Sequence, residues 1–166
     1  MEEMRMNQSF EAQNLPMKWH KFMIYFALWF GAVMGFVVGF FLLNNSLLMW
    51  QYNPLYIAFP ALRYLNIALA VCIIALAACQ IYVRFQLAGF RIGAPEKLFT
   101  LYKVGIAVSV IDIVLTIAII MINTNVPLSA ILREFSWQIL RDIVPSVIMF
   151  FCNKVYYNKR AHLFVN

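Results

Sequence analysis

Four long apolar runs constrain this chain more than any other feature of its sequence. The hydrocarbon core of a bilayer is about 30 Å thick, and a helix crosses it with about 20 apolar residues. Runs of about that length cover residues 22–43, 65–83, 104–122 and 139–157. We therefore predict an all-α integral membrane protein whose four transmembrane helices pack as a four-helix bundle.

The composition leaves little room for a soluble fold. Of the 166 residues, 64% are hydrophobic and 12% are charged, against about 25% charged in soluble chains. The fourth run is the least apolar, because Arg141, Asp142 and Pro145 fall within it. The runs divide the chain into an N-terminal arm (1–21), a transmembrane domain (22–157) and a basic tail (158–166).

The distribution of Lys and Arg predicts the topology. All but three of the 13 Lys and Arg residues lie in the arm, in the link between the second and third spans, or in the tail region. The three exceptions are Arg63, Arg133 and Arg141. Because cytoplasmic segments carry an excess of Lys and Arg, both termini are predicted to be cytoplasmic. The net charge of +6 follows largely from this topology, so we expect no nucleic-acid partner.

The two outward links predict interfacial or amphipathic segments. The first, residues 44–63, is rich in aromatic residues and interrupted by Pro54 and Pro60. It is predicted to lie in the membrane interface or fold onto the bundle; a lid over a cavity is the alternative. The second, residues 123–137, predicts a short amphipathic helix lying on the membrane surface. Its apolar face comprises Leu128, Ile131, Leu132 and Phe135.

A seam of small residues runs along the first span. Ala27, Gly31, Gly35 and Gly39 recur every four residues, so they lie on one face of a helix. In lipid, close backbone approach through small residues favours helix association. The seam is predicted to contact either another helix of the bundle or a second copy of the chain. The opposite side is predicted to meet lipid through Phe22, Phe26, Trp29, Phe36 and Phe40.

Polar residues inside the spans are the candidate functional residues. Asp112 lies near the middle of the third span, where a carboxylate is costly and should face the bundle interior. Arg141 is a possible counter-ion, predicted nearer the outer surface. The other polar residues of the spans are Ser109 and Thr116 in the third, Asn66 and Gln80 in the second, and Asp142, Ser146 and Asn153 in the fourth. Two interpretations explain their presence: they form interhelical hydrogen bonds, or they line a proton- or ion-coupled pathway centred on Asp112.

The sequence offers no positive evidence for catalysis, cofactors or metals. No nucleophile elbow or zinc-protease motif occurs, and no phosphate-binding loop. Cys72, Cys79 and Cys152 are not spaced as a redox pair or a zinc site, and we expect buried free thiols. His20 and His162 lie at the cytoplasmic boundary rather than mid-span. We therefore expect no cofactor and no metal, and we favour a protein that is not an enzyme.

The segments LPMKWHKFMIYFALWFGAV and NKVYYNKRAHLFVN resemble small four-span membrane proteins of Gram-positive gut anaerobes. The resemblance implies a bacterial plasma membrane location and transfers no functional residue.

The expected function is helix association as a scaffold, assembly factor or accessory subunit. Its partners would be the lipid bilayer and a second copy or another membrane protein. The alternative is a small proton- or ion-coupled transporter or channel centred on Asp112.

Overall fold

The described part of the chain is helical throughout. The computed structural model describes residues 17–124 and 126–164, except for the side chains of Gln138 and Asp142, and all regular structure in these residues is helix. Four stretches are long and apolar enough to cross a membrane, which confirms the prediction of four spans. They are Lys18–Leu47, Pro60–Ala88, Ala94–Asn123 and Leu128–Asn158.

Each stretch extends beyond its predicted apolar run. The first comprises three segments in sequence, and the fourth comprises two. Tyrosine and basic residues continue the helices past the apolar core, as side chains that reach the headgroup level do. The elements are α2 (Lys18–Phe22), π-helix η1 (Met23–Ala27), α3 (Leu28–Leu47), η2 (Trp50–Tyr52), α4 (Pro54–Ala58), α5 (Pro60–Ala88), α6 (Ala94–Asn123), α7 (Leu128–Asp142), α8 (Val144–Asn158) and η3 (Ala161–Leu163).

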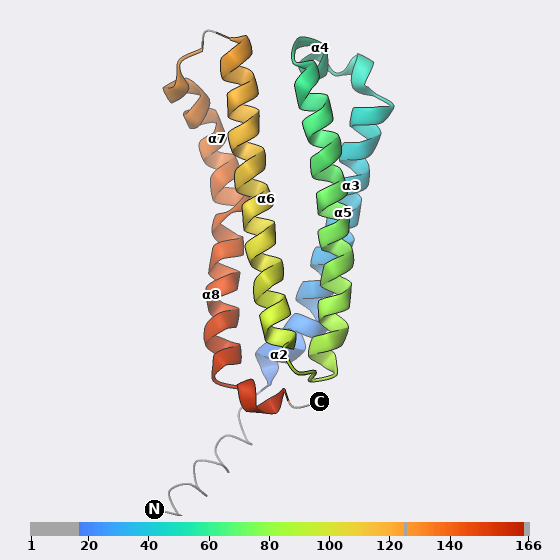
Figure 1. Cartoon of the computed structure of the whole chain (residues 1–166), viewed down its shortest axis with the longest axis vertical. Coiled ribbons are helices and arrows are strands. Elements are labelled where there is room, and N and C mark those ends of the chain that lie inside the picture. Colours follow the sequence, from blue (N-terminus) through green and yellow to red (C-terminus); the bar gives the residue numbers. More distant parts are fainter. Residues whose placement is uncertain (1–16, 125, 165–166) are drawn as a thin grey trace, which may run out of the picture.

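The long helices run alternately up and down, each beside its neighbour in sequence (Figure 1). α3 packs on α5, α5 on α6, and α6 on α8, as short connections between helices favour. Both described ends of the chain lie at the same end of the bundle, together with the α5–α6 turn (Figure 1). We call this the terminal end, and the opposite end, which carries α4, the distal end. Most of the predicted arm, residues 1–16, lies outside the described residues.

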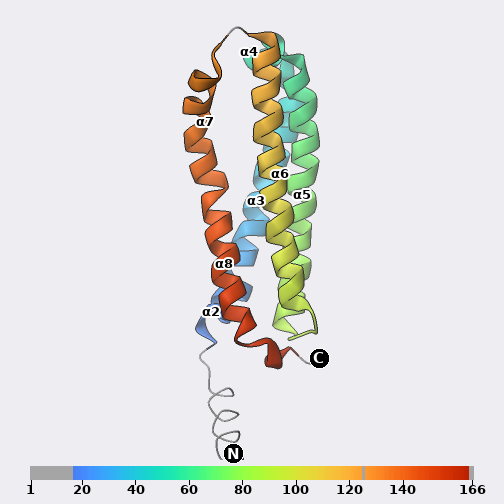
Figure 2. The same cartoon turned by 60° about the vertical axis from the view of Figure 1, so that its left-hand side comes forward.

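The fourth stretch differs from the prediction in where it begins. α7 continues the line of α8 instead of lying across the end of the bundle (Figure 1 and Figure 2), and among the described residues it contacts α6 at only a few positions. Only Ile143 separates α7 from α8, and its backbone stays helical (φ −92°, ψ −49°). Pro145 falls in the first turn of α8, where the lack of an N–H is tolerated. The helical path therefore continues through this region with little change of direction (Figure 1).

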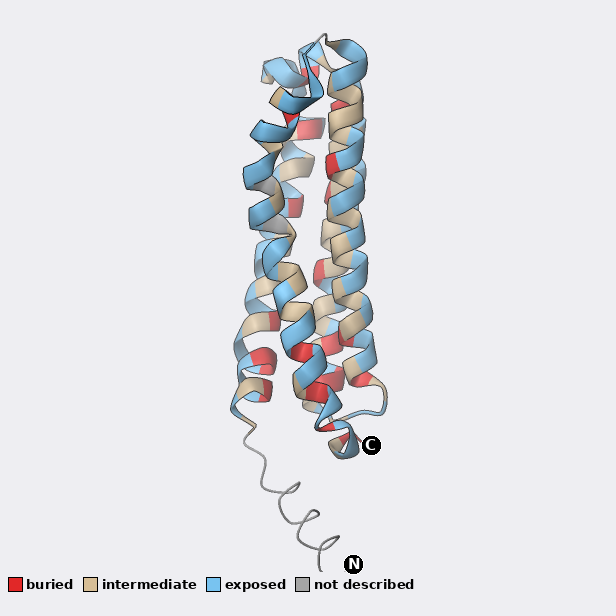
Figure 3. Ribbon diagram, turned by 90° about the vertical axis from the view of Figure 1, so that its left-hand side faces the viewer, coloured by how far each residue is buried: buried red, intermediate tan, exposed pale blue. Residues whose placement is uncertain are grey.

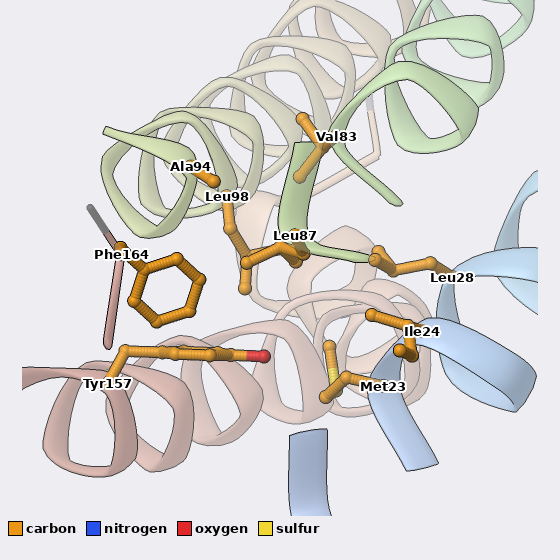
Figure 4. Packing of buried hydrophobic residues seen from close by; sticks show 9 residues of the cluster. All are labelled: Met23, Ile24, Leu28, Val83, Leu87, Ala94, Leu98, Tyr157 and Phe164. Carbon is orange, nitrogen blue, oxygen red and sulfur yellow. The ribbon is translucent and has the colours of Figure 1, made fainter. Parts of the chain in front are cut away.

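The largest apolar core lies at the terminal end. Side chains from α8, from the α5–α6 region and from the first stretch meet there (Figure 4). Buried residues gather at this end, while the outer faces of the helices are exposed (Figure 3). Such exposed apolar faces suit a protein solvated by lipid. The core residues are Met23, Ile24, Leu28, Val83, Leu87, Ala94, Leu98, Tyr157 and Phe164.

The three cysteines are not buried. Cys72, Cys79 and Cys152 are free thiols on exposed faces of their helices, so the expectation of buried thiols was wrong. Within a lipid-solvated helix an outward position is itself apolar, and a thiol behaves there as a small hydrophobic group. The sequence could not distinguish inward from outward positions, because in a membrane helix both are apolar.

Candidate functional site

A cavity of about 740 Å³ lies between the helices. Its lining comes from α3, α5, α6, α7 and α8, so no single pair of helices forms it. On α6, Ser109, Asp112 and Thr116 form a polar stripe that faces this space. The cavity brings together most of the predicted intramembrane polar residues: Asn66, Ser109, Asp112, Thr116, Arg141 and Ser146.

Asp112 and Arg141 reach the same cavity from segments far apart in the sequence. Arg141 does so because α7 runs along the bundle in line with α8 (Figure 1). The cavity thus combines an acid, a base, hydroxyls and an amide. A carboxylate can bind a cation or exchange a proton, and a guanidinium can bind an anion.

Two of the predicted polar residues, Gln80 and Asn153, do not line this cavity. Gln80 lies against Gly31, where its amide oxygen fills the space that a side chain would occupy. Asn153 lies fully buried near the terminal end. The side chain of Asp142 is outside the described residues.

The small-residue seam faces α5. A Cβ added to Gly35 would lie 2.9 Å from the Cβ of Ala77, and one added to Gly39 would lie 2.5 Å from Cγ1 of Ile74. Both distances are shorter than side chains tolerate, so the glycines allow α3 and α5 to approach closely. Ala27 packs against the terminal core. On the opposite side Phe22, Phe26, Trp29 and Phe40 are exposed, and Phe36 is half-buried.

A hydrogen-bond network holds α4 against the distal ends of α3 and α5. The buried Tyr56 hydroxyl accepts a bond of 2.8 Å from the Asn66 amide and shares one of 3.2 Å with the Ser46 hydroxyl. Arg63 donates to the Ser46 carbonyl at 2.8 Å and stacks over the Trp50 ring at 4.5 Å. Since Asn66 also lines the cavity, α4 is connected directly to the cavity wall.

A second network closes the terminal end, with Asn153 at its centre. Its side-chain oxygen accepts a bond of 3.0 Å from the indole N–H of Trp19. Its amide donates to the Met149 carbonyl at 2.8 Å and to the Tyr102 hydroxyl at 3.4 Å. One residue on α8 therefore connects α2 and α6. We call this network, with the aromatic cluster beside it, the terminal closure.

The aromatic part of the terminal closure surrounds His20, which is 2% exposed. Its Nδ1 shares a hydrogen bond of 3.1 Å with the Tyr157 hydroxyl. Its ring stacks on Phe90 at 4.9 Å and meets Phe164 edge-on at 6.0 Å. Phe90 adopts φ 50°, a region that bulky residues seldom enter, and its packing on His20 holds it there.

Sequence reasoning missed His20 and Tyr157. The sequence places His20 at the cytoplasmic boundary and Tyr157 at the end of the fourth apolar run, where aromatic and basic side chains are common. Their hydrogen bond joins positions 137 residues apart, and no local pattern marks such a pair. The one signal was that KWHK and VYYNKR were both predicted at the same end of the bundle.

The first span contains a π-helical turn, Met23–Ala27, beside the terminal closure. Here Nε of Arg84 on α5 donates to the Ile24 carbonyl at 3.1 Å. The guanidinium also stacks on Trp29 and Phe85, at 5.4 Å and 4.7 Å from their ring centres. π-Turns are rare and leave carbonyls poorly paired within the helix, so Arg84 satisfies a group that the turn exposes.

Among residues 17–124 and 126–164, no group of three or more His, Cys, Asp or Glu side chains is placed to hold a metal ion. Comparisons of the chain with family models, with curated proteins and with solved structures find no match.

Proposed function

We propose that this chain is a small integral membrane transporter or channel in which the Asp112 cavity binds a proton, an ion or a small polar solute. The observation that carries the proposal is the shared lining of one cavity by Asp112, Arg141 and Asn66 from three separate helices. Ionisable residues inside membrane spans are rare and mark ion, proton or substrate pathways by default.

The arrangement of the two networks supports access from the distal side. On α6 the cavity extends from Gly105 to Thr116, whereas Tyr102 belongs to the terminal closure. A smaller cavity of about 230 Å³ shares Leu76, Gly105 and Ser146 with it and reaches Tyr102 and Met149. The hydrogen-bonded terminal closure begins at these two residues. A pathway that is closed at one end and polar within is the arrangement that alternating access requires.

The charge distribution orients this pathway. With the basic terminal end in the cytoplasm, the chain would lie in the bacterial plasma membrane with its cavity accessible from outside. Opening toward the cytoplasm would then require the terminal closure to separate.

The test is flux in liposomes that contain the purified full chain. Proton uptake and the flux of monovalent ions are measured under an imposed gradient, for the wild type, Asp112→Asn and Thr100→Val. Thr100 lies on α6 outside the Asp112 cavity and bonds only to the Glu96 carbonyl of its own helix among the described contacts. We expect at least a tenfold loss of flux in Asp112→Asn and none in Thr100→Val. The absence of any flux in the wild type, or equal flux in all three, would contradict the proposal.

Helix association, as a scaffold or accessory subunit, is the second candidate. The helices contact one another mainly in sequence order, and the outer face of α3 exposes apolar side chains such as Phe40 and Phe41, so this face could receive a partner helix. The glycine seam is less available for this purpose because α5 already faces it. Native mass spectrometry distinguishes helix association from transport. A stable dimer or a co-purifying membrane subunit, together with the absence of flux in liposomes, would favour association.

A further inference from the structure

We infer that the groove between α2 and α8 at the terminal end is a binding site for one anionic phospholipid. The groove has a volume of about 610 Å³ and is separate from the Asp112 cavity. Its wall is apolar and its mouth is basic. The residues that carry the inference are Trp19, Phe151, Val155, Tyr156, Lys159 and Arg160.

The wall of the groove suits an acyl chain. Phe151 and Val155 lie one turn apart on α8, and their side chains are 56% and 58% exposed. They belong to a helix that is long and apolar enough, with α7, to cross a membrane, so this outward face meets lipid tails. A groove on such a face is filled by an acyl chain rather than by water.

The mouth of the groove suits an anionic headgroup. Lys159 is the exposed cation there, and Arg160 beside it is 7% exposed, so its positive charge acts on the mouth from beneath the surface. Arg160 is positioned by its neighbours: its guanidinium carbon lies 3.9 Å from the centre of the Tyr156 ring, and Nη1 donates to the Tyr156 carbonyl at 3.3 Å. Trp19 and Tyr156 flank this point, at the level where amphipathic rings contact headgroups.

The charge of the terminal end selects an anionic lipid over a zwitterionic one. Among the described residues of this end Glu96 is the one acid, against nine bases. Basic residues near a membrane surface attract anionic lipids by about 1 kcal/mol each. The nine are Lys18, Lys21, Arg84, Arg91, Lys97, Lys103, Lys154, Lys159 and Arg160.

The test uses the purified full chain and native mass spectrometry, with phosphatidylglycerol and phosphatidylcholine of identical acyl chains as probes. We expect the wild type to retain one phosphatidylglycerol at least about fivefold better than phosphatidylcholine, which is the effect of one headgroup cation. Lys159→Gln removes a mouth cation, and Val155→Trp fills the groove. Each variant should reduce phosphatidylglycerol retention about fivefold.

Arg91→Gln is the matched control, since Arg91 is an exposed base of the same end that does not line the groove. It should leave retention unchanged. Three results would each overturn the inference. These are equal retention of the two lipids, an equal loss in Arg91→Gln and Lys159→Gln, or undiminished retention in Val155→Trp. Circular dichroism on every variant confirms that the helices are intact.

Discussion

Gly35 shows how one absent side chain determines the distance between two helices. Its position against Ala77 leaves no room for a Cβ, and helices in lipid depend on such close packing because lipid is as apolar as their side chains. Gly105, on α6, is the opposite case, because an added Cβ would meet no atom within 4 Å. The two glycines therefore form a matched pair for substitution.

We predict that Gly35→Leu lowers the free energy of unfolding by about 1–3 kcal/mol, the usual cost of overpacking a tight contact. Gly105→Leu should change it by no more than about 0.5 kcal/mol, as substitutions away from packed features do. Unfolding in mixed detergent, followed by circular dichroism, measures both. Equal stability of the two variants would show that the seam does not set the α3–α5 distance.

Asn153 shows that the role of a polar residue in a span also depends on which helices surround it. Sequence position predicted an intramembrane polar residue, with a pathway as one of its interpretations. Its observed bonds to Trp19, Tyr102 and Met149 are instead those of a residue that joins three helical segments. Its burial is consistent with this role, since a buried amide must be hydrogen-bonded to avoid a large desolvation cost.

At the scale of elements, short α4 is held by a few polar contacts. Tyr56 is the one buried residue of this helix, and its hydroxyl makes both bonds to Ser46 and Asn66. An element held by so few contacts opens more readily than the long helices. Because Asn66 belongs to the cavity wall, opening of α4 would release its amide from the Tyr56 hydroxyl.

We predict that Tyr56→Phe increases hydrogen exchange at residues 50–58 about tenfold. It removes two bonds of about 0.6 kcal/mol each, and 1.4 kcal/mol corresponds to a factor of ten. Tyr52→Phe is the control, because Tyr52 belongs to the same segment but is 76% exposed. Exchange measured by mass spectrometry should leave α5 and α6 unchanged in both variants. An equal increase in both would mean that the Tyr56 hydroxyl does not hold α4.

The π-turn Met23–Ala27 is the other element whose geometry depends on a partner. A turn of this kind widens the helix and leaves a carbonyl available, which Arg84 satisfies from α5. The turn lies next to Met23 and Ile24 of the terminal core. A movement of the terminal closure would therefore involve both the π-turn and Arg84.

At the scale of the molecule, an even number of membrane-crossing stretches brings both described ends of the chain to one end of the bundle. The concentration of bases there predicts that this end is cytoplasmic. We predict that, in right-side-out bacterial vesicles, a membrane-impermeant maleimide labels Tyr52→Cys but not His162→Cys. Inverted vesicles should show the reverse. Cys72, Cys79 and Cys152 are first replaced by Ala. Labelling of both positions from the same side would contradict the topology.

The sequence by itself determined the class of protein and the approximate position of its four spans. This is possible because crossing a bilayer requires a length of apolar helix, and length is a local property that 20 consecutive residues display. It also identified the polar stripe of α6 and the small-residue seam of α3, since both repeat with the helical period.

The tertiary structure alone decided which of these faces meet. Arg141 reaches the Asp112 cavity because α7 aligns with α8 through a helical junction at Ile143, whereas the sequence predicts a separate surface helix over residues 123–137. His20 and Tyr157 meet because the two ends of the chain converge. Inward and outward faces of a membrane helix are both apolar, so hydrophobicity does not distinguish them; small residues, polar residues and packing do.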